Sequence, residues 1–85
     1  MMNNKNKKLL QQIFSKPTPK NVLYTDLENL FVSLGCEILQ GNGSRVAFKK
    51  NNIRVDFHKP HPNKELKPYQ VNDAKNFLIK LGITI

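Results

Sequence analysis

Basic side chains and a histidine recur within a short stretch whose pattern is that of two β-strands. Arg45, Lys49 and Arg54 are cationic residue types, and His58 supplies an imidazole, a side chain that can take up or release a proton under mild conditions. A guanidinium can donate two parallel hydrogen bonds to a phosphate, and an imidazole can transfer a proton during a reaction at that phosphate. These residue types would therefore suit a phosphate-bearing ligand, and they include one group suited to acid-base chemistry.

The turn between the two strands decides whether these side chains share a face. Asn51-Asn52 is predicted to be a two-residue hairpin turn joining strands of about 44–50 and 53–58. That turn sets Arg45 opposite His58. Strict alternation then directs one set of residues outward, away from the apolar side that carries Val46, Phe48, Val55 and Phe57. The outward set is Arg45, Ala47, Lys49, Arg54, Asp56 and His58.

A solvated sheet face also carries charged residues, so the cluster alone does not separate ligand binding from simple solubility. Lys49 opposite Arg54 favours binding, because like charges directly across two strands reduce stability unless an anion lies on them. Asp56, on the same face, is expected to orient one of the cations.

Other chemically interesting residues have competing interpretations. No third His or Cys lies near His58 and His61, so we predict no metal site. His61 is either an exposed loop residue or a second proton carrier or phosphate contact. Tyr69 can stack on a base or pack against the loop. Cys36 is expected to be a small buried hydrophobic residue without a disulfide partner.

Two main helices are predicted to pack on the apolar side of the sheet. The first begins at Thr25-Asp26-Leu27-Glu28, a capping-box sequence, continues with apolar residues at helical spacing and ends at Gly35. The second, about 68–81, accepts Pro68 in its first turn and ends at Gly82.

One more strand, about 36–40, precedes the hairpin and connects to it through the Gly41-Asn42-Gly43 turn. The predicted order is α-β-β-β-α, an α+β fold with a three-stranded antiparallel sheet. An additional short amphipathic helix, carrying Leu9, Leu10, Ile13 and Phe14, should stop before Pro17. We therefore divide the chain into an N-terminal basic helix with a proline linker, 1–20, and a main domain, 21–85. The first helix either packs on the domain or frays and serves a partner.

Length and charge limit the classes of function. With 85 residues, the chain can build one modest core, so we expect no deep pocket for a small-molecule ligand or cofactor. Fourteen Lys and Arg against six Asp and Glu give a net charge of +8, which suits nucleic acid, although an anionic membrane or an acidic protein would respond to the same field. No signal peptide or membrane span is recognisable, so we expect a cytoplasmic protein.

From about Tyr24 to Ile83 the sequence resembles the HicA toxins of bacterial HicA-HicB toxin-antitoxin pairs. The likeness is carried by Leu34-Gly35-Cys36-Glu37, Gly43-Ser44, a histidine-containing turn, Asn63-Lys64-Glu65-Leu66-Lys67 and Leu81-Gly82-Ile83. It implies a fold similar to the double-stranded-RNA-binding domain, cleavage of mRNA without a metal, and a HicB-type antitoxin as partner. RNA contacts are then expected from Ser44, Lys49, Arg54 and His61. The first helix is additional to the family pattern.

The family has its catalytic histidine directly after the Gly-Ser pair, where this sequence has Arg45. Two hypotheses follow. In the first, the protein is an endoribonuclease in which His58 activates the ribose 2′-hydroxyl and Arg45 stabilises charge on the phosphate. In the second, it is a non-catalytic module that binds RNA or DNA.

Overall fold

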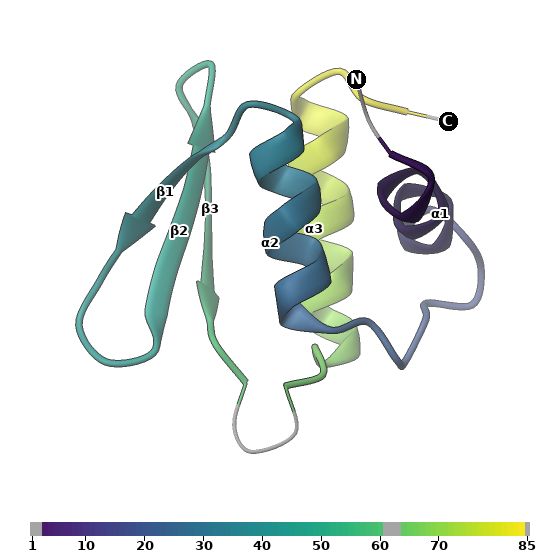
Figure 1. Cartoon of the computed structure of the whole chain (residues 1–85), viewed down its shortest axis with the longest axis horizontal. Coiled ribbons are helices and arrows are strands. Elements are labelled where there is room, and N and C mark those ends of the chain that lie inside the picture. The colour runs from purple at the N-terminus through teal and green to yellow at the C-terminus, as the bar shows by residue number, and fades with distance from the viewer. Residues whose placement is uncertain (1–2, 61–63, 85) are drawn as a thin grey trace.

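The computed structural model describes residues 3–60 and 64–84 and has the predicted α+β architecture (Figure 1). Its elements in chain order are α1 (Asn4–Ile13), α2 (Tyr24–Ser33), β1 (Glu37–Gln40), β2 (Arg45–Lys50), β3 (Ile53–His58) and α3 (Pro68–Lys80). The strands and α3 differ from their predicted limits by at most one residue at an end, whereas the N-cap of α2 lies two residues before the predicted one.

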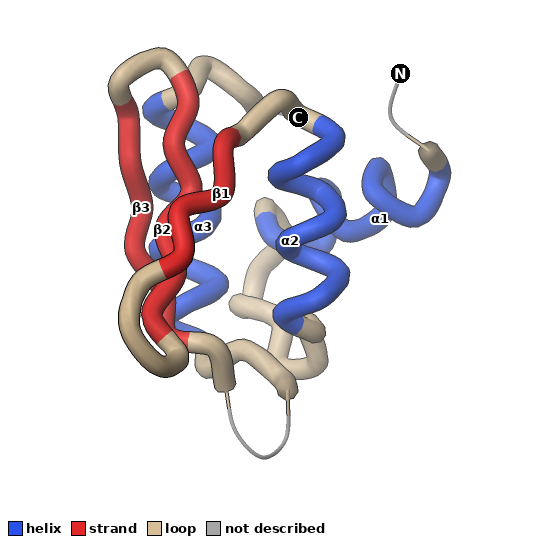
Figure 2. The backbone as a smooth tube through the Cα atoms, turned by 60° about the vertical axis from the view of Figure 1, so that its left-hand side comes forward, coloured by secondary structure: helices blue, strands red, loops and turns tan. Residues whose placement is uncertain are grey.

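The elements form three layers. The sheet has the strand order β1-β2-β3, with both neighbouring pairs antiparallel. Helices α2 and α3 cover one face of the sheet, and α1 lies on the far side of these two helices (Figures 1 and 2). The other face of the sheet is covered by no described helix, so its side chains are available to a ligand.

The β2–β3 hairpin has the predicted turn and register. Asn51 and Asn52 have φ values of 53° and 65°, the left-handed conformations that a two-residue turn requires. The turn pairs Lys50 with Ile53, and the register then runs without slippage to Arg45 opposite His58. Alternation consequently directs the side chains of this last pair away from the helices.

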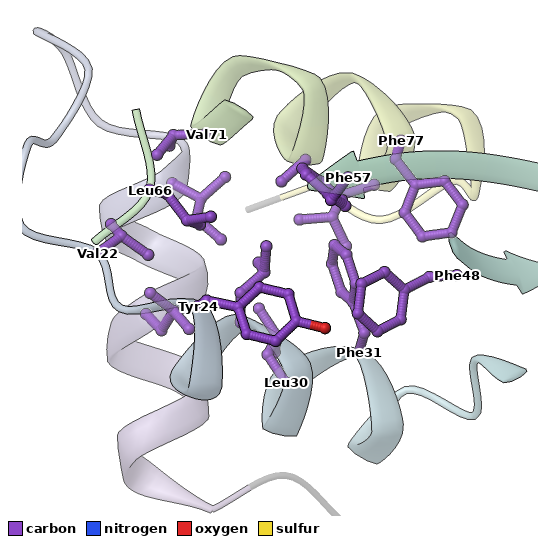
Figure 3. Close-up of a cluster of buried hydrophobic side chains, with 14 of the residues drawn as sticks. Val22, Tyr24, Leu30, Phe31, Phe48, Phe57, Leu66, Val71 and Phe77 are labelled. Atoms are coloured by element: carbon purple, nitrogen blue, oxygen red, sulfur yellow. The ribbon is translucent and has the colours of Figure 1, made fainter. Parts of the chain in front are cut away.

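Aromatic side chains connect the sheet to the helices (Figure 3). The fully buried Phe31 of α2 packs edge-on against Phe48 of β2, with ring centroids 4.8 Å apart, and against Phe77 of α3 at 5.2 Å. Phe48 in turn contacts Phe57 of β3 at 6.0 Å. Because one ring of α2 touches both the central strand and the second helix, the orientation of the sheet on the helix pair is well defined.

The two ends of α2 differ in how well the sequence predicted them. The predicted capping box at Thr25 is wrong. The N-cap is Leu23, which makes no side-chain cap hydrogen bond. The Tyr24 N–H donates instead to the Lys64 carbonyl at 2.9 Å. A tertiary contact thus satisfies the end of the helix in place of a local side chain. The C-terminus is as predicted, because Gly35 has φ +88° and the Cys36 N–H donates to the Phe31 carbonyl in a Schellman motif.

Helix α1 packs on the domain, one of its two expected alternatives. Leu9 and Ile13 are buried in the common hydrophobic cluster with residues of α2 and α3. Lys5 also forms an ion pair with Asp26 of α2, with 3.1 Å between Nζ and Oδ1. Within the described ranges 3–60 and 64–84, no helix has the length and hydropathy needed to cross a membrane.

Candidate nucleic-acid interface

The outward side chains of β2 and β3 form a surface that we call the basic face: Arg45, Ala47, Lys49, Arg54, Asp56 and His58. The five polar members are exposed, whereas Ala47 is only 2% exposed. Ala47 lies between Leu39 of β1 and Asp56 of β3 in the register, so its methyl group forms the floor between longer side chains. The basic face is therefore a shallow depression with charged walls.

Arg45 and His58 are direct neighbours across the strands. The Lys59 N–H donates to the Ser44 carbonyl at 2.8 Å, one residue beyond the pair on each strand, which makes Arg45–His58 a non-hydrogen-bonded pair. Side chains in such pairs start closer together than in hydrogen-bonded ones. The guanidinium of Arg45 and the imidazole of His58 thus project side by side into solvent.

The cations of the basic face differ in whether an acidic side chain pairs with them. Arg54 donates from Nε to Asp56 Oδ1 at 2.9 Å, so Asp56 orients a cation as expected. This exposed pair offsets part of the repulsion between Lys49 and Arg54, and the like-charge argument for a bound anion is correspondingly weaker. Arg45 and Lys49 form no ion pair with any residue in the described ranges.

A groove of about 580 Å³, which we call the sheet groove, runs over the basic face. Its walls include Arg45, Arg54, Asp56 and His58, together with Asn42 from the β1–β2 loop. Lys49 lies nearer the hairpin turn and does not line it. The structure therefore brings Arg45, Arg54 and His58 together and leaves Lys49 as a more distant charge.

A second groove of about 540 Å³, the helix groove, lies between the end of β3 and the start of α3. It is lined by Lys20, Ser44, His58, Lys59, Pro60, Glu65, Leu66, Lys67, Pro68, Tyr69 and Gln70. His58 belongs to both grooves. Ser44, predicted to be an RNA contact, lines the helix groove and not the sheet groove.

The backbone at His58 is held by a residue that sequence reasoning missed. Gln70 of α3 is only 4% exposed, and its Nε2 donates to the His58 carbonyl at 3.0 Å. Its Oε1 accepts from the Lys67 N–H at 2.9 Å, the arrangement of a glutamine at the third position of a helix. The spacing Lys67-x-x-Gln70 was the available signal. Gln70 thereby fixes the end of β3 to the start of α3 while the imidazole stays exposed.

Gly41 has a steric role next to Arg45. A β-carbon at position 41 would lie 3.1 Å from the Arg45 Cβ and 3.3 Å from the Arg45 carbonyl oxygen. The Gly41 N–H also donates to that carbonyl at 2.9 Å, which closes the β1–β2 loop. A side chain at position 41 would therefore require Arg45 to shift by a few tenths of an ångström. From the sequence, Gly41 was predicted only as part of a turn.

The remaining candidates are placed as follows. His61 lies outside the described residues. Cys36 is buried, as predicted, and burial raises the pKa of its thiol, although the Lys50 ammonium partly counteracts the shift. Tyr69 is 59% exposed. Within residues 3–60 and 64–84, no group of three or more His, Cys, Asp or Glu side chains lies close enough to hold a metal ion.

The fold and the basic face define a small α+β protein whose outward sheet surface presents cations and a histidine. A family model described as the HicA toxin of bacterial toxin-antitoxin systems matches residues 24–83. The chain belongs to the HicA toxin family. Helix α1 precedes the matched region. No curated protein and no solved structure matches the chain.

Proposed function

We propose that this chain is the toxin of a HicA-HicB-type pair and that it binds and cleaves mRNA on the basic face without a metal. The observation that carries the proposal is the exposed Arg45–His58 pair, set side by side by the hairpin register. Family membership supports the toxin role, and the net charge of +8 supports a polyanionic substrate.

The chemistry assigned to this pair is an internal attack on the RNA chain. His58 takes the proton of a ribose 2′-hydroxyl, and the 2′ oxygen forms a bond to the adjacent phosphorus. Arg45 stabilises the charge on the pentacoordinate phosphate. The bond to the 5′ oxygen then breaks, and this oxygen takes a proton from water or from a second acid, for which His61 is the candidate by sequence. The products are a 2′,3′-cyclic phosphate and a free 5′-hydroxyl.

Lys49 and Arg54 are assigned to positioning the RNA strand. Lys49 is exposed without an ion partner in the described ranges, and Arg54 is oriented by Asp56. An antitoxin of the HicB type would inhibit the toxin most directly by covering Arg45 and His58 with an acidic surface. A complex that leaves both side chains open to solvent would contradict this mode of inhibition.

The deciding experiment is to incubate the purified full chain with a defined RNA in the presence of EDTA and to identify the ends of any fragments. Cleavage that survives EDTA and leaves cyclic phosphate ends is the expected result. Growth arrest on induced expression in bacteria, relieved by a His58→Ala substitution, would support the same conclusion.

A second candidate function is binding of RNA or DNA without cleavage. It is favoured by one observation, that Arg45 stands where the family has its catalytic histidine. Salt-sensitive binding by a protein that leaves RNA intact would establish this alternative.

A further inference from the structure

The helix groove has a different chemical character from the sheet groove. The walls of the sheet groove include two arginines and an aspartate, whereas the helix groove combines Pro60, Pro68 and the ring of Tyr69 with lysines and a glutamate. In Figure 1 the end of β3 and the start of α3 lie together at the lower edge of the molecule. A ligand that fits both grooves must combine an anionic part with a flat apolar part.

Tyr69 is the exposed aromatic side chain of the helix groove. It is 59% exposed at the second position of α3, although tyrosine rings commonly bury most of their surface. The other large apolar side chains exposed in the described ranges, Leu23, Val32 and Ile79, are aliphatic and line neither groove. An exposed aromatic ring at a groove, flanked by cations, is the surface on which single-stranded nucleic-acid-binding proteins stack bases.

The cations around Tyr69 are placed to hold a phosphate. Lys20 and Lys67 line the same groove with exposed side chains and form no ion pair within the described ranges. Lys59 also lines it, but its Nζ lies over the ring of Tyr24, 5.9 Å from the centroid. Lys20 and Lys67 are therefore the cations available to a ligand next to Tyr69, in a groove that is also lined by the Glu65 carboxylate.

We propose that the helix groove binds one unpaired nucleobase, stacked on Tyr69, with the neighbouring phosphate held by Lys20 and Lys67. This inference rests on the proposed function and extends it, because His58 lies on the boundary between the two grooves. A strand whose phosphate lies at Arg45 and His58 in the sheet groove would continue past His58 and place its next base on Tyr69.

The proposal specifies the class of substrate. A base within a duplex is stacked on both faces and paired along its edge, so it cannot lie against a protein ring without leaving the helix. The binding site therefore selects single-stranded or looped RNA, even though the fold is like that of a double-stranded-RNA-binding domain.

The test measures binding of a fluorescently labelled single-stranded RNA that has 2′-O-methyl groups, which prevent attack by the 2′ oxygen. Loss of one stacked base costs about 1–3 kcal/mol, so Tyr69→Ala should weaken affinity about 5- to 150-fold. Tyr69→Phe keeps the ring and should bind within about twofold of the wild type. Ile79→Ala, an exposed site on the same helix, is the matched control.

A second measurement reports stacking itself. RNA that carries 2-aminopurine should lose fluorescence on binding to the wild type and to Tyr69→Phe but not to Tyr69→Ala. Equal affinities for Tyr69→Ala and the wild type would overturn the inference while leaving the proposed RNA binding intact. An equal loss in Ile79→Ala, or a wild-type preference for duplex over single strand, would also overturn it. Absence of any RNA binding by the wild type at low salt would overturn both proposals.

Discussion

The resemblance to HicA toxins sets Arg45 at the position of their catalytic histidine, and a guanidinium is too weak an acid to act as a base. The proposed mechanism therefore assigns proton transfer to a histidine, and His58 is the neighbour of Arg45 across the strands. We expect His58→Ala to reduce the single-turnover cleavage rate about 10²-fold or more with little loss of RNA affinity. Unchanged cleavage by the folded variant would transfer the role to His61.

Arg45→Lys keeps the charge but removes the fork that can hold two phosphate oxygens. We expect weaker RNA binding and slower cleavage together, which distinguishes this variant from His58→Ala, in which mainly the rate falls. Lys8→Arg, at an exposed site on α1, is the control for an exchange of cation type away from the basic face. Wild-type values of both affinity and rate for Arg45→Lys would show that the fork is not used.

The hydroxyl oxygen of Tyr24 is a single polar atom in the core, and its effect on stability can be tested. Its hydroxyl is buried, has no hydrogen-bond partner in the described ranges and is directed toward the phenylalanine rings (Figure 3). Burial raises the pKa of this phenol above its ordinary value of 10.0, and the Glu28 carboxylate, which is near the hydroxyl but outside hydrogen-bonding geometry, raises it further. Above about pH 10 the unfolded state therefore releases a proton that the folded state keeps, so the free energy of unfolding falls as pH rises.

Tyr24→Phe should remove this part of the alkaline loss of stability. At neutral pH it should leave the free energy of unfolding unchanged or raise it by up to about 1 kcal/mol, because no hydrogen bond is lost. Urea unfolding of both proteins at neutral and alkaline pH measures the difference. A Tyr24→Phe protein that is less stable by more than about 1 kcal/mol at neutral pH would indicate a hydrogen bond to the hydroxyl.

At the scale of elements, sequence reasoning succeeded where the deciding interactions are local. The Asn51-Asn52 turn fixes the hairpin register by itself, and Gly35 and Gly82, at φ +88° and +82°, end their helices as predicted. It failed at the start of α2, where the Lys64 carbonyl replaces the expected Thr25 cap. Such a contact depends on how distant segments meet, which no local pattern records.

Helix α1 lies outside the region matched by the family model, so substitutions in it test whether its packing stabilises the domain. Ile13 is 2% exposed and belongs to the same cluster as residues of α2 and α3. Ile13→Ala should therefore cost about 2–5 kcal/mol, seen as a lower urea midpoint. Gln11→Ala, on the exposed side of α1, should cost less than about 0.5 kcal/mol. Equal stability of both variants with the wild type would mean that α1 is not docked in solution.

For the whole molecule, the sequence predicted the basic face but not the helix groove. The basic face lies on one hairpin, so period-two alternation was sufficient to assemble Arg45, Arg54 and His58. The helix groove joins the proline linker at Lys20, the end of β3 and the start of α3. Only the folded chain brings these three segments together. The sequence alone therefore left two alternatives open for Tyr69, stacking on a base or packing against the loop.

A net charge of +8 attracts RNA to the whole protein, so binding at one particular surface has to be distinguished from attraction by total charge. Binding of single-stranded RNA falls with salt with a logarithmic slope of about −0.7 for each phosphate neutralised. Lys49→Ala with Arg54→Ala should therefore weaken binding for all sequences and reduce the slope by about 0.7 to 1.4.

The matched control for this experiment removes two charges from the opposite side of the molecule. Lys7 and Lys8 are exposed on α1, which lies beyond α2 and α3 from the sheet (Figure 2). Lys7→Ala with Lys8→Ala changes the net charge by the same amount as the basic-face variant, so general attraction alone would give the two variants equal salt slopes. We expect the α1 variant to keep the wild-type slope, because its charges lie where a strand bound to the basic face does not reach. Equal loss in both variants would show that affinity follows total charge, and the assignment of RNA to the basic face would then be wrong.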